Sequence, residues 1–175
     1  MSYPASVEPW LRDTHPEVPA VGRAVLHALD LALEDLTTWT DGLTDVEVHA
    51  RPLGLPSIAF QLKHIARSLD RLLTYAEGDQ LSPDQLALLK AEQNQPNQPE
   101  EASLAVLLVE VEGALRAAAG RVRGLSTADL NTPRSVGRKQ LPTSIGGALV
   151  HVADHTQRHV GQVITTAKVL KGLRR

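Results

Sequence analysis

Three histidines on one predicted helix are the residues with the clearest chemical potential. His151, His155 and His159 stand four residues apart in the segment HVADHTQRH. Since an α-helix turns by about 100° per residue, the three side chains lie within about 80° of one another on one face. Two imidazoles at this spacing can converge on one cation, so either His151 with His155 or His155 with His159 makes a chelating pair. The competing interpretation is a polar helix face whose histidines meet solvent or one another.

A histidine on an earlier predicted helix extends this argument. His64 lies at the edge of an apolar stripe, from where its imidazole can point toward a neighbouring helix. One histidine from that helix and two from the last would form a three-His site with an open coordination position. Catalytic zinc sites use such an open position to bind and acidify a nucleophile. Taken alone, His64 is better explained as a core-edge histidine hydrogen-bonded to a carbonyl.

Several other kinds of chemistry are excluded by the motifs. The segment HTQRH has Thr156 where the HExxH motif of metalloproteases has its glutamate, so that peptidase mechanism fails. The chain contains no glycine-rich phosphate loop and no GxSxG serine elbow. It also contains no cysteine, which removes disulfides, thiolate ligands and a cysteine nucleophile.

Four predicted helices must position the histidines. Alanine and leucine dominate the apolar residues and only 3% of the chain is aromatic, which favours helices over strands. The helical segments span residues 16–40, 57–77, 100–123 and 143–170, with Ser57 opening the second, Gly78 closing it, and Thr143 or Ser144 capping the last. The polar segment 79–100 leaves room for a short helix over 82–92, and 125–142 is predicted to be a loop or short hairpin. We therefore expect an all-α, antiparallel four-helix bundle, with an N-terminal arm over 1–15 and a single domain over 16–175.

Charge and hydropathy exclude further partners. The net charge of −2 in 175 residues, without a lysine and arginine stripe, argues against binding to nucleic acid or to an anionic membrane. No apolar run approaches the length of a membrane span, and the N-terminus does not read as a signal peptide. The expected location is the cytoplasm.

The histidine segments also carry a family resemblance. SIAFQLKHIARSLDRLL followed by GGALVHVADHTQRHVGQV resembles the DinB/YfiT-like superfamily of metal-dependent enzymes, over roughly residues 18–170. The resemblance implies a four-helix bundle in up-down-down-up order that binds a divalent metal, zinc or nickel, through His64, His155 and His159. His151 then lies one turn outside the ligand set, and Gln162, three residues past His159, is placed to orient an imidazole. Thr156 departs from the glutamate often found in the family.

For function, the resemblance implies a class of reaction. Relatives are similar to thiol S-transferases that use bacillithiol, mycothiol or glutathione, so we expect a small-molecule thiol and an electrophile as substrates. Arg67 and Arg158 lie beside the histidines and are candidates to hold a substrate carboxylate, while no catalytic residue is assigned. The alternatives are a metal-dependent hydrolase and a non-catalytic, metal-binding stress-response protein. The resemblance also implies a homodimer, for which the apolar Val25, Leu29 and Leu33 of the first helix offer a surface.

Overall fold

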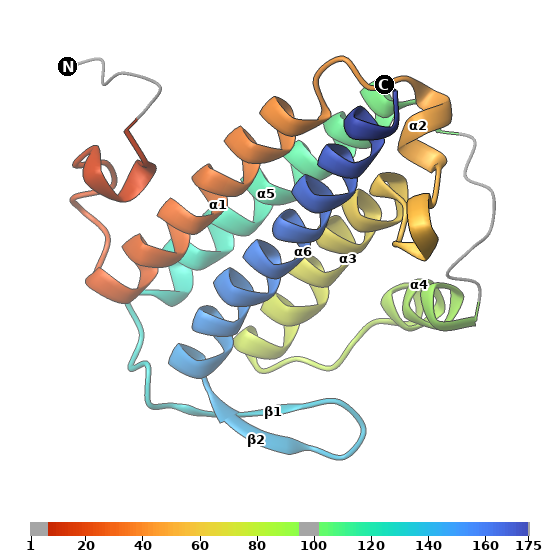
Figure 1. Ribbon diagram of the computed structural model, residues 1–175. Helices are drawn as coiled ribbons and strands as arrows, with labels where there is room; N and C mark the ends of the chain where they lie inside the picture. The colour runs from red at the N-terminus through yellow and green to blue at the C-terminus, as the bar shows by residue number, and fades with distance from the viewer. Residues whose placement is uncertain (1–6, 95–101, 175) are drawn as a thin grey trace.

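The protein is mostly helical, with one small sheet. The computed structural model describes residues 7–94 and 102–174 (Figure 1). Within these ranges the elements are the 3-10 helices η1 (Pro9–Leu11) and η2 (Pro52–Gly54), the helices α1 (Ala20–Thr40), α2 (Asp45–His49), α3 (Ile58–Glu77), α4 (Pro83–Asn94), α5 (Leu104–Leu125) and α6 (Ile145–Leu173), and the strands β1 (Pro133–Val136) and β2 (Leu141–Ser144). The chain is therefore mostly helical, as predicted, and the segment before α6 adopts the hairpin that was one of its two predicted forms.

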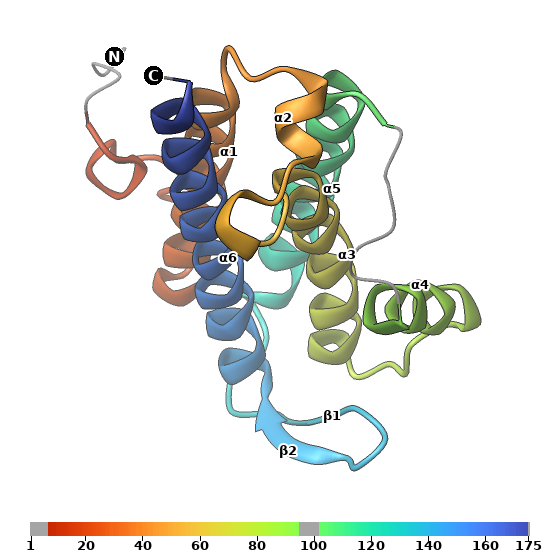
Figure 2. The ribbon, with the colours of Figure 1, turned by 45° about the vertical axis from the view of Figure 1, so that its right-hand side comes forward.

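The four long helices enclose the core. α6 packs against α1 and α3, and α5 packs against the same two helices from the other side. In Figures 1 and 2, α1 and α6 run in one direction while α3 and α5 run in the opposite one. Every one of these helices contributes fully buried aliphatic side chains, among them Leu26, Leu36, Leu62, Leu69, Leu107, Val111, Leu149 and Val152. None of the helices in the described ranges combines the length and apolarity needed to cross a membrane.

The ends of the helices follow local chemistry. The Ser57 hydroxyl accepts a hydrogen bond from the backbone N–H of Phe60 at 3.2 Å and so caps α3. Gly78 ends the same helix in the left-handed conformation, with φ of 96°, which costs glycine little. Ser144 caps α6, as one of the two predicted candidates. α1 starts at Ala20 and not at residue 16, because Pro19 disfavours a helical conformation in the residue before it.

Residues 133–144 form an antiparallel hairpin that leads directly into α6. Val136 pairs with Leu141, and Gly137, with φ of 70°, lies in the turn between them. Figure 2 shows the hairpin extending away from the four long helices at the N-terminal end of α6. The backbone N–H of Ile145 donates to the carbonyl of Thr132 at 3.1 Å. The hairpin thereby ties the start of the histidine-bearing helix to the preceding loop.

The apolar side chains suggested for a dimer surface are used inside the chain. Val25 and Leu29 are 2% and 3% exposed, and Leu33 packs against the same core. These residues therefore offer no free surface for a second copy, which corrects that part of the sequence argument. Residues 7–15 of the predicted arm pack on α1, where Arg12 donates to the Glu34 carboxylate at 2.8 Å. The boundary at residue 15 stays a prediction.

Candidate metal centre

Three histidines from two helices meet at one point of the structure. His64 of α3 lies against His155 and His159 of α6, and one ring nitrogen from each lies within 4.8 Å of the other two. The ring centroid of His64 is 4.3 Å from that of His159 and 5.3 Å from that of His155. No other such group of histidine and carboxylate side chains occurs among residues 7–94 and 102–174.

Buried neighbours in the sequence explain why these side chains face one another. Leu62 and Ile65, on either side of His64 in the sequence, are fully buried. Their burial places His64 at the edge of the core. On α6, Thr156 follows His155 and Val160 follows His159, and each of these two residues is only 1% exposed. Their burial fixes which face of α6 points toward the core. Since α3 packs against α6, the polar edges of both helices coincide at this contact.

His159 is held by two glutamine side chains. Its Nδ1–H donates to Oε1 of Gln61 at 2.8 Å and to Oε1 of Gln162 at 2.7 Å. Both acceptors are amide oxygens, so Nδ1 carries the proton and Nε2 keeps its lone pair. Gln162 is the residue predicted to orient an imidazole; the structure places it in contact with His159, and the role itself stays a prediction. Gln61 was missed as a partner, although a glutamine one turn from His64 in an apolar stripe was a usable signal.

Burial keeps two of the imidazoles neutral. The pKa of His155 is lowered to about 4 by burial and then by the neighbouring charges of His159, His151, His64 and Arg158. The pKa of His159 is lowered as well, mainly by burial, against a raising contribution from Gln162. Neutral imidazoles have lone pairs for a cation, which protonated ones lack.

The donor set fits a divalent metal ion. Imidazole nitrogens suit zinc, copper, iron and nickel. The buried Nδ1 of His155 has no hydrogen-bond partner among the described residues, so a cation in the cluster would offset the desolvation of this ring. The cluster can therefore hold a metal ion, with no negative ligand to reduce its charge.

Glu92 of α4 completes the surroundings of His64. The carboxylate Oε2 lies 3.4 Å from Nδ1 of His64 and 3.1 Å from Arg71, while Oε1 lies 3.6 Å from Arg67. Burial acts to raise the pKa of Glu92, but the contacts with His64 and Arg71 outweigh it and the pKa is lowered. Sequence reasoning missed Glu92 because nothing local links α4 to a histidine 28 residues earlier.

Two residues considered in the sequence analysis, His151 and Thr156, lie outside the cluster. His151 is 45% exposed and its Nδ1 pairs with Asp154 at 2.9 Å, although its ring centroid is 5.4 Å from that of His155. The Thr156 hydroxyl donates to the carbonyl of Val152 at 2.7 Å, facing the core. Thr156 therefore takes no part in the chemistry of the cluster.

The remaining histidines have ordinary hydrogen-bond partners. His27 Nε2 contacts the carbonyl of Thr14 at 3.1 Å, and His49 Nε2 contacts that of Ala102 at 2.9 Å. His15 pairs with a carboxylate at 2.9 Å. The three converging imidazoles differ from these, because one ring nitrogen of each lies within 4.8 Å of those of the other two.

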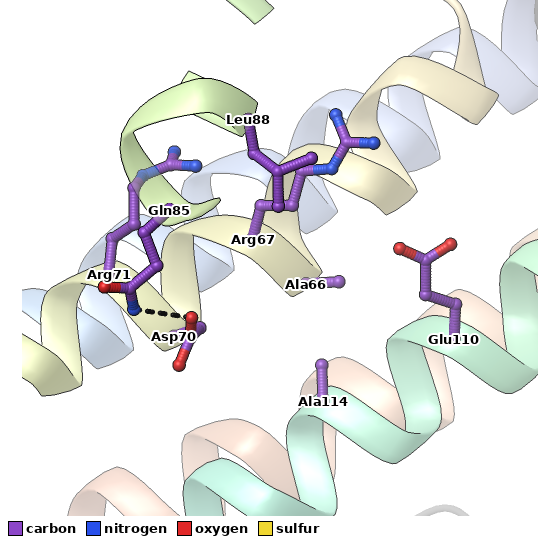
Figure 3. A pocket seen from close by; sticks show the side chains of 8 residues that line it. All are labelled: Ala66, Arg67, Asp70, Arg71, Gln85, Leu88, Glu110 and Ala114. Carbon is purple, nitrogen blue, oxygen red and sulfur yellow. Dashed lines mark hydrogen bonds between the residues drawn. The ribbon is translucent and has the colours of Figure 1, made fainter. Parts of the chain in front are cut away.

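A pocket of about 210 Å³ lies between α3, α4 and α5 (Figure 3), and none of the three clustered histidines lines it. The side chains that line it are Ala66, Arg67, Asp70, Arg71, Gln85, Leu88, Glu110 and Ala114. Gln85 donates to Asp70 at 2.6 Å across the pocket. Arg67 and Arg71 both contact Glu92 as well, which links the pocket to His64. Arg158, the other arginine predicted near the histidines, is exposed on α6.

Fold and site together define a mostly helical protein with a candidate three-His metal centre between two of its long helices. The sequence profile of the DinB superfamily matches residues 28–163, and the chain belongs to this superfamily. A crystal structure of a conserved protein from Enterococcus faecalis is similar, with a TM-score of 0.59 and 20% sequence identity over 88% of this chain and 99% of that one. This likeness concerns the fold alone. A search among curated proteins found no match.

Proposed function

We propose that His64, His155 and His159 bind one divalent metal ion, zinc or nickel, and that the protein is a metal-dependent enzyme of the DinB superfamily. The observation that carries this proposal is the convergence of three ring nitrogens within 4.8 Å, from helices far apart in the sequence. Membership of the superfamily supports it. The pairwise packing of α1, α3, α5 and α6 supports the four-helix bundle expected for the family.

Transfer of a small-molecule thiol is the reaction that this donor set favours. When bound, a divalent cation on three neutral imidazoles supplies the positive charge that stabilises a thiolate at neutral pH. The chain has no cysteine, so the thiol must enter as a cosubstrate. The reaction forms a bond from sulfur to the electrophilic carbon, while the leaving group departs with the bonding electrons and the thiol proton is released.

The pocket between α3, α4 and α5 supports an acidic thiol as the cosubstrate, because Glu92 connects its two arginines to His64. Arg67 and Arg71 line it and present guanidinium groups to the side facing Glu92. Guanidinium groups suit the carboxylates that a bacillithiol-like thiol carries. Arg158, exposed near His155 and His159, offers a further contact for an anionic group.

Metal stoichiometry in untagged protein tests the site. We expect about one zinc or nickel per chain, and a severe loss of binding in each of His64→Ala, His155→Ala and His159→Ala. His151→Ala is the matched control, because it removes an imidazole from the same helix and should leave about one metal per chain. Loss of metal in His151→Ala with retention in His159→Ala would show that the other chelating pair is used.

Activity assays separate the possible functions of a metal-loaded protein. Incubation with bacillithiol and monochlorobimane should give the conjugate faster with the wild type than with His159→Ala. Thiol-independent turnover of esters or amides would instead indicate a hydrolase. A protein that binds metal but turns over neither class would be a metal-binding protein without catalysis, such as a stress-response factor.

The homodimer rests on the family resemblance. Light scattering on the wild type at micromolar concentration tests it, and a mass near the 18.9 kDa of one chain would remove the idea.

A further inference from the structure

Helix α4 delivers one acidic side chain to the histidine cluster. α4 lies outside the four long helices, packs alongside α3, and exposes most of its residues (Figures 1 and 2). Glu92 is an exception, since its side chain is only 8% exposed. Its carboxylate lies over His64, Arg67 and Arg71, which follow one another at helical spacing along α3.

The contact with His64 has a chemical consequence for the imidazole. A carboxylate between two guanidinium groups is ionised and can only accept hydrogen bonds. In the neutral imidazole that metal binding requires, the one proton of His64 must then sit on Nδ1, which faces Glu92 Oε2 at 3.4 Å. This leaves the lone pair on Nε2, the nitrogen that does not face Glu92. Metal-binding histidines commonly donate their second N–H to a carboxylate in this way, which fixes the tautomer and the ring orientation.

We propose that Glu92 is a positioning residue of the metal centre, which holds His64 in the Nδ1–H tautomer with Nε2 free to bind the metal. Arg67 and Arg71 hold the Glu92 carboxylate in place, and α4 is thereby part of the site. The inference rests on the proposed three-His centre. His159 has its own orienting acceptors in Gln61 of α3 and Gln162 of α6, whereas the acceptor beside His64 comes from α4.

Zinc affinity measured by competition with a chromophoric chelator tests this role in the full chain. Glu92→Leu removes both acceptor oxygens, and we expect the affinity for zinc to fall 10- to 100-fold. The isosteric Glu92→Gln keeps an oxygen but loses the charge, and should fall between this variant and the wild type. Asp84→Asn is the matched control, because Asp84 is exposed on α4, and its affinity should stay within twofold.

The ring tautomer of His64 gives a readout that does not depend on metal. Nitrogen-15 NMR of the metal-free wild type should show His64 protonated at Nδ1, with its signals assigned by their loss in His64→Ala. Glu92→Leu should shift His64 toward the Nε2–H tautomer, while Asp84→Asn should not.

The outcomes separate this inference from the proposed function. An Nε2–H tautomer in the wild type, or zinc affinity in Glu92→Leu within twofold of the wild type, would overturn the positioning role. Weaker zinc binding with an unchanged tautomer would also overturn it, because Glu92 would then only dock α4. If the wild type binds neither zinc nor nickel, the proposed metal function fails, whereas the tautomer of the metal-free protein still decides whether Glu92 orients His64.

Discussion

The two glutamines beside His159 predict a specific pattern of metal affinities. One N–H, at Nδ1, is shared between Oε1 of Gln61 at 2.8 Å and Oε1 of Gln162 at 2.7 Å. Removing either acceptor leaves the other in place, so the tautomer of His159 survives each single change. Removing both leaves the N–H without an acceptor and frees the ring to rotate or to exchange tautomers. The substitutions Gln61→Leu and Gln162→Leu, singly and together, therefore act non-additively.

The size of each effect follows from the hydrogen bonds. A neutral hydrogen bond contributes about 0.5–1.5 kcal/mol, and the retained acceptor recovers part of that, so each single change should weaken zinc binding less than about fivefold. A donor left without any acceptor in a partly buried site costs about 1–3 kcal/mol, so the double variant should lose about 10- to 100-fold. The loss in the double variant should exceed the product of the two single losses, with a coupling energy of about 1 kcal/mol.

Chelator competition on the four proteins of this double-mutant cycle measures these values, and urea denaturation confirms that each variant is folded. Ser68→Ala is the control for deletion of a buried polar group on α3, because the Ser68 hydroxyl donates to the carbonyl of Ile65 and not to a histidine. Zinc affinity should be unchanged in it. Strictly additive losses, or a double variant that binds zinc like the wild type, would refute the shared-acceptor argument.

Three further outcomes concern stability. In the metal-free protein the pKa of His155 is about 4, below its ordinary 6.5; the unfolded chain takes up the proton first as the pH falls, so the free energy of unfolding should decrease from pH 6.5 to pH 4. The full pKa shift corresponds to about 3 kcal/mol of unfolding free energy, and because the ring is partly exposed we expect roughly half of that. Urea denaturation at pH 7 and pH 4.5 measures this, and the wild type should lose more stability between the two pH values than His155→Gln does, by about that amount. Leu149→Ala removes a fully buried core side chain and should lower the free energy of unfolding by about 2–5 kcal/mol, as measured by urea denaturation. Thr156→Val removes only a hydroxyl that bonds to its own helix, so the free energy of unfolding measured by calorimetry should change by no more than about 1 kcal/mol. Metal content should stay the same in this variant, and a loss of metal would give Thr156 a role at the site.

Much of the local structure was predictable from the sequence because its causes are local. Ser57 and Ser144 cap their helices through hydrogen bonds to residues three positions on, and Gly78 ends α3 because glycine takes a positive φ at little cost. The spacing of His155 and His159 likewise depends only on the period of a helix. The hairpin before α6 was one of two possibilities, since four-residue strands carry too weak a pattern to decide.

Only the tertiary structure decided which histidines converge. Spacing on α6 allowed His151 with His155 as readily as His155 with His159, and the choice depends on which turn of α6 packs beside His64. The contacts of Gln61 with His159, 98 residues away, and of Glu92 with His64 arise from the packing of α6 and α4 on α3. Such contacts depend on how whole helices dock, and docking is determined by the combined shape of many buried side chains. A helical period identifies the residues that share a face of one helix, whereas the partner opposite that face is determined by the core as a whole.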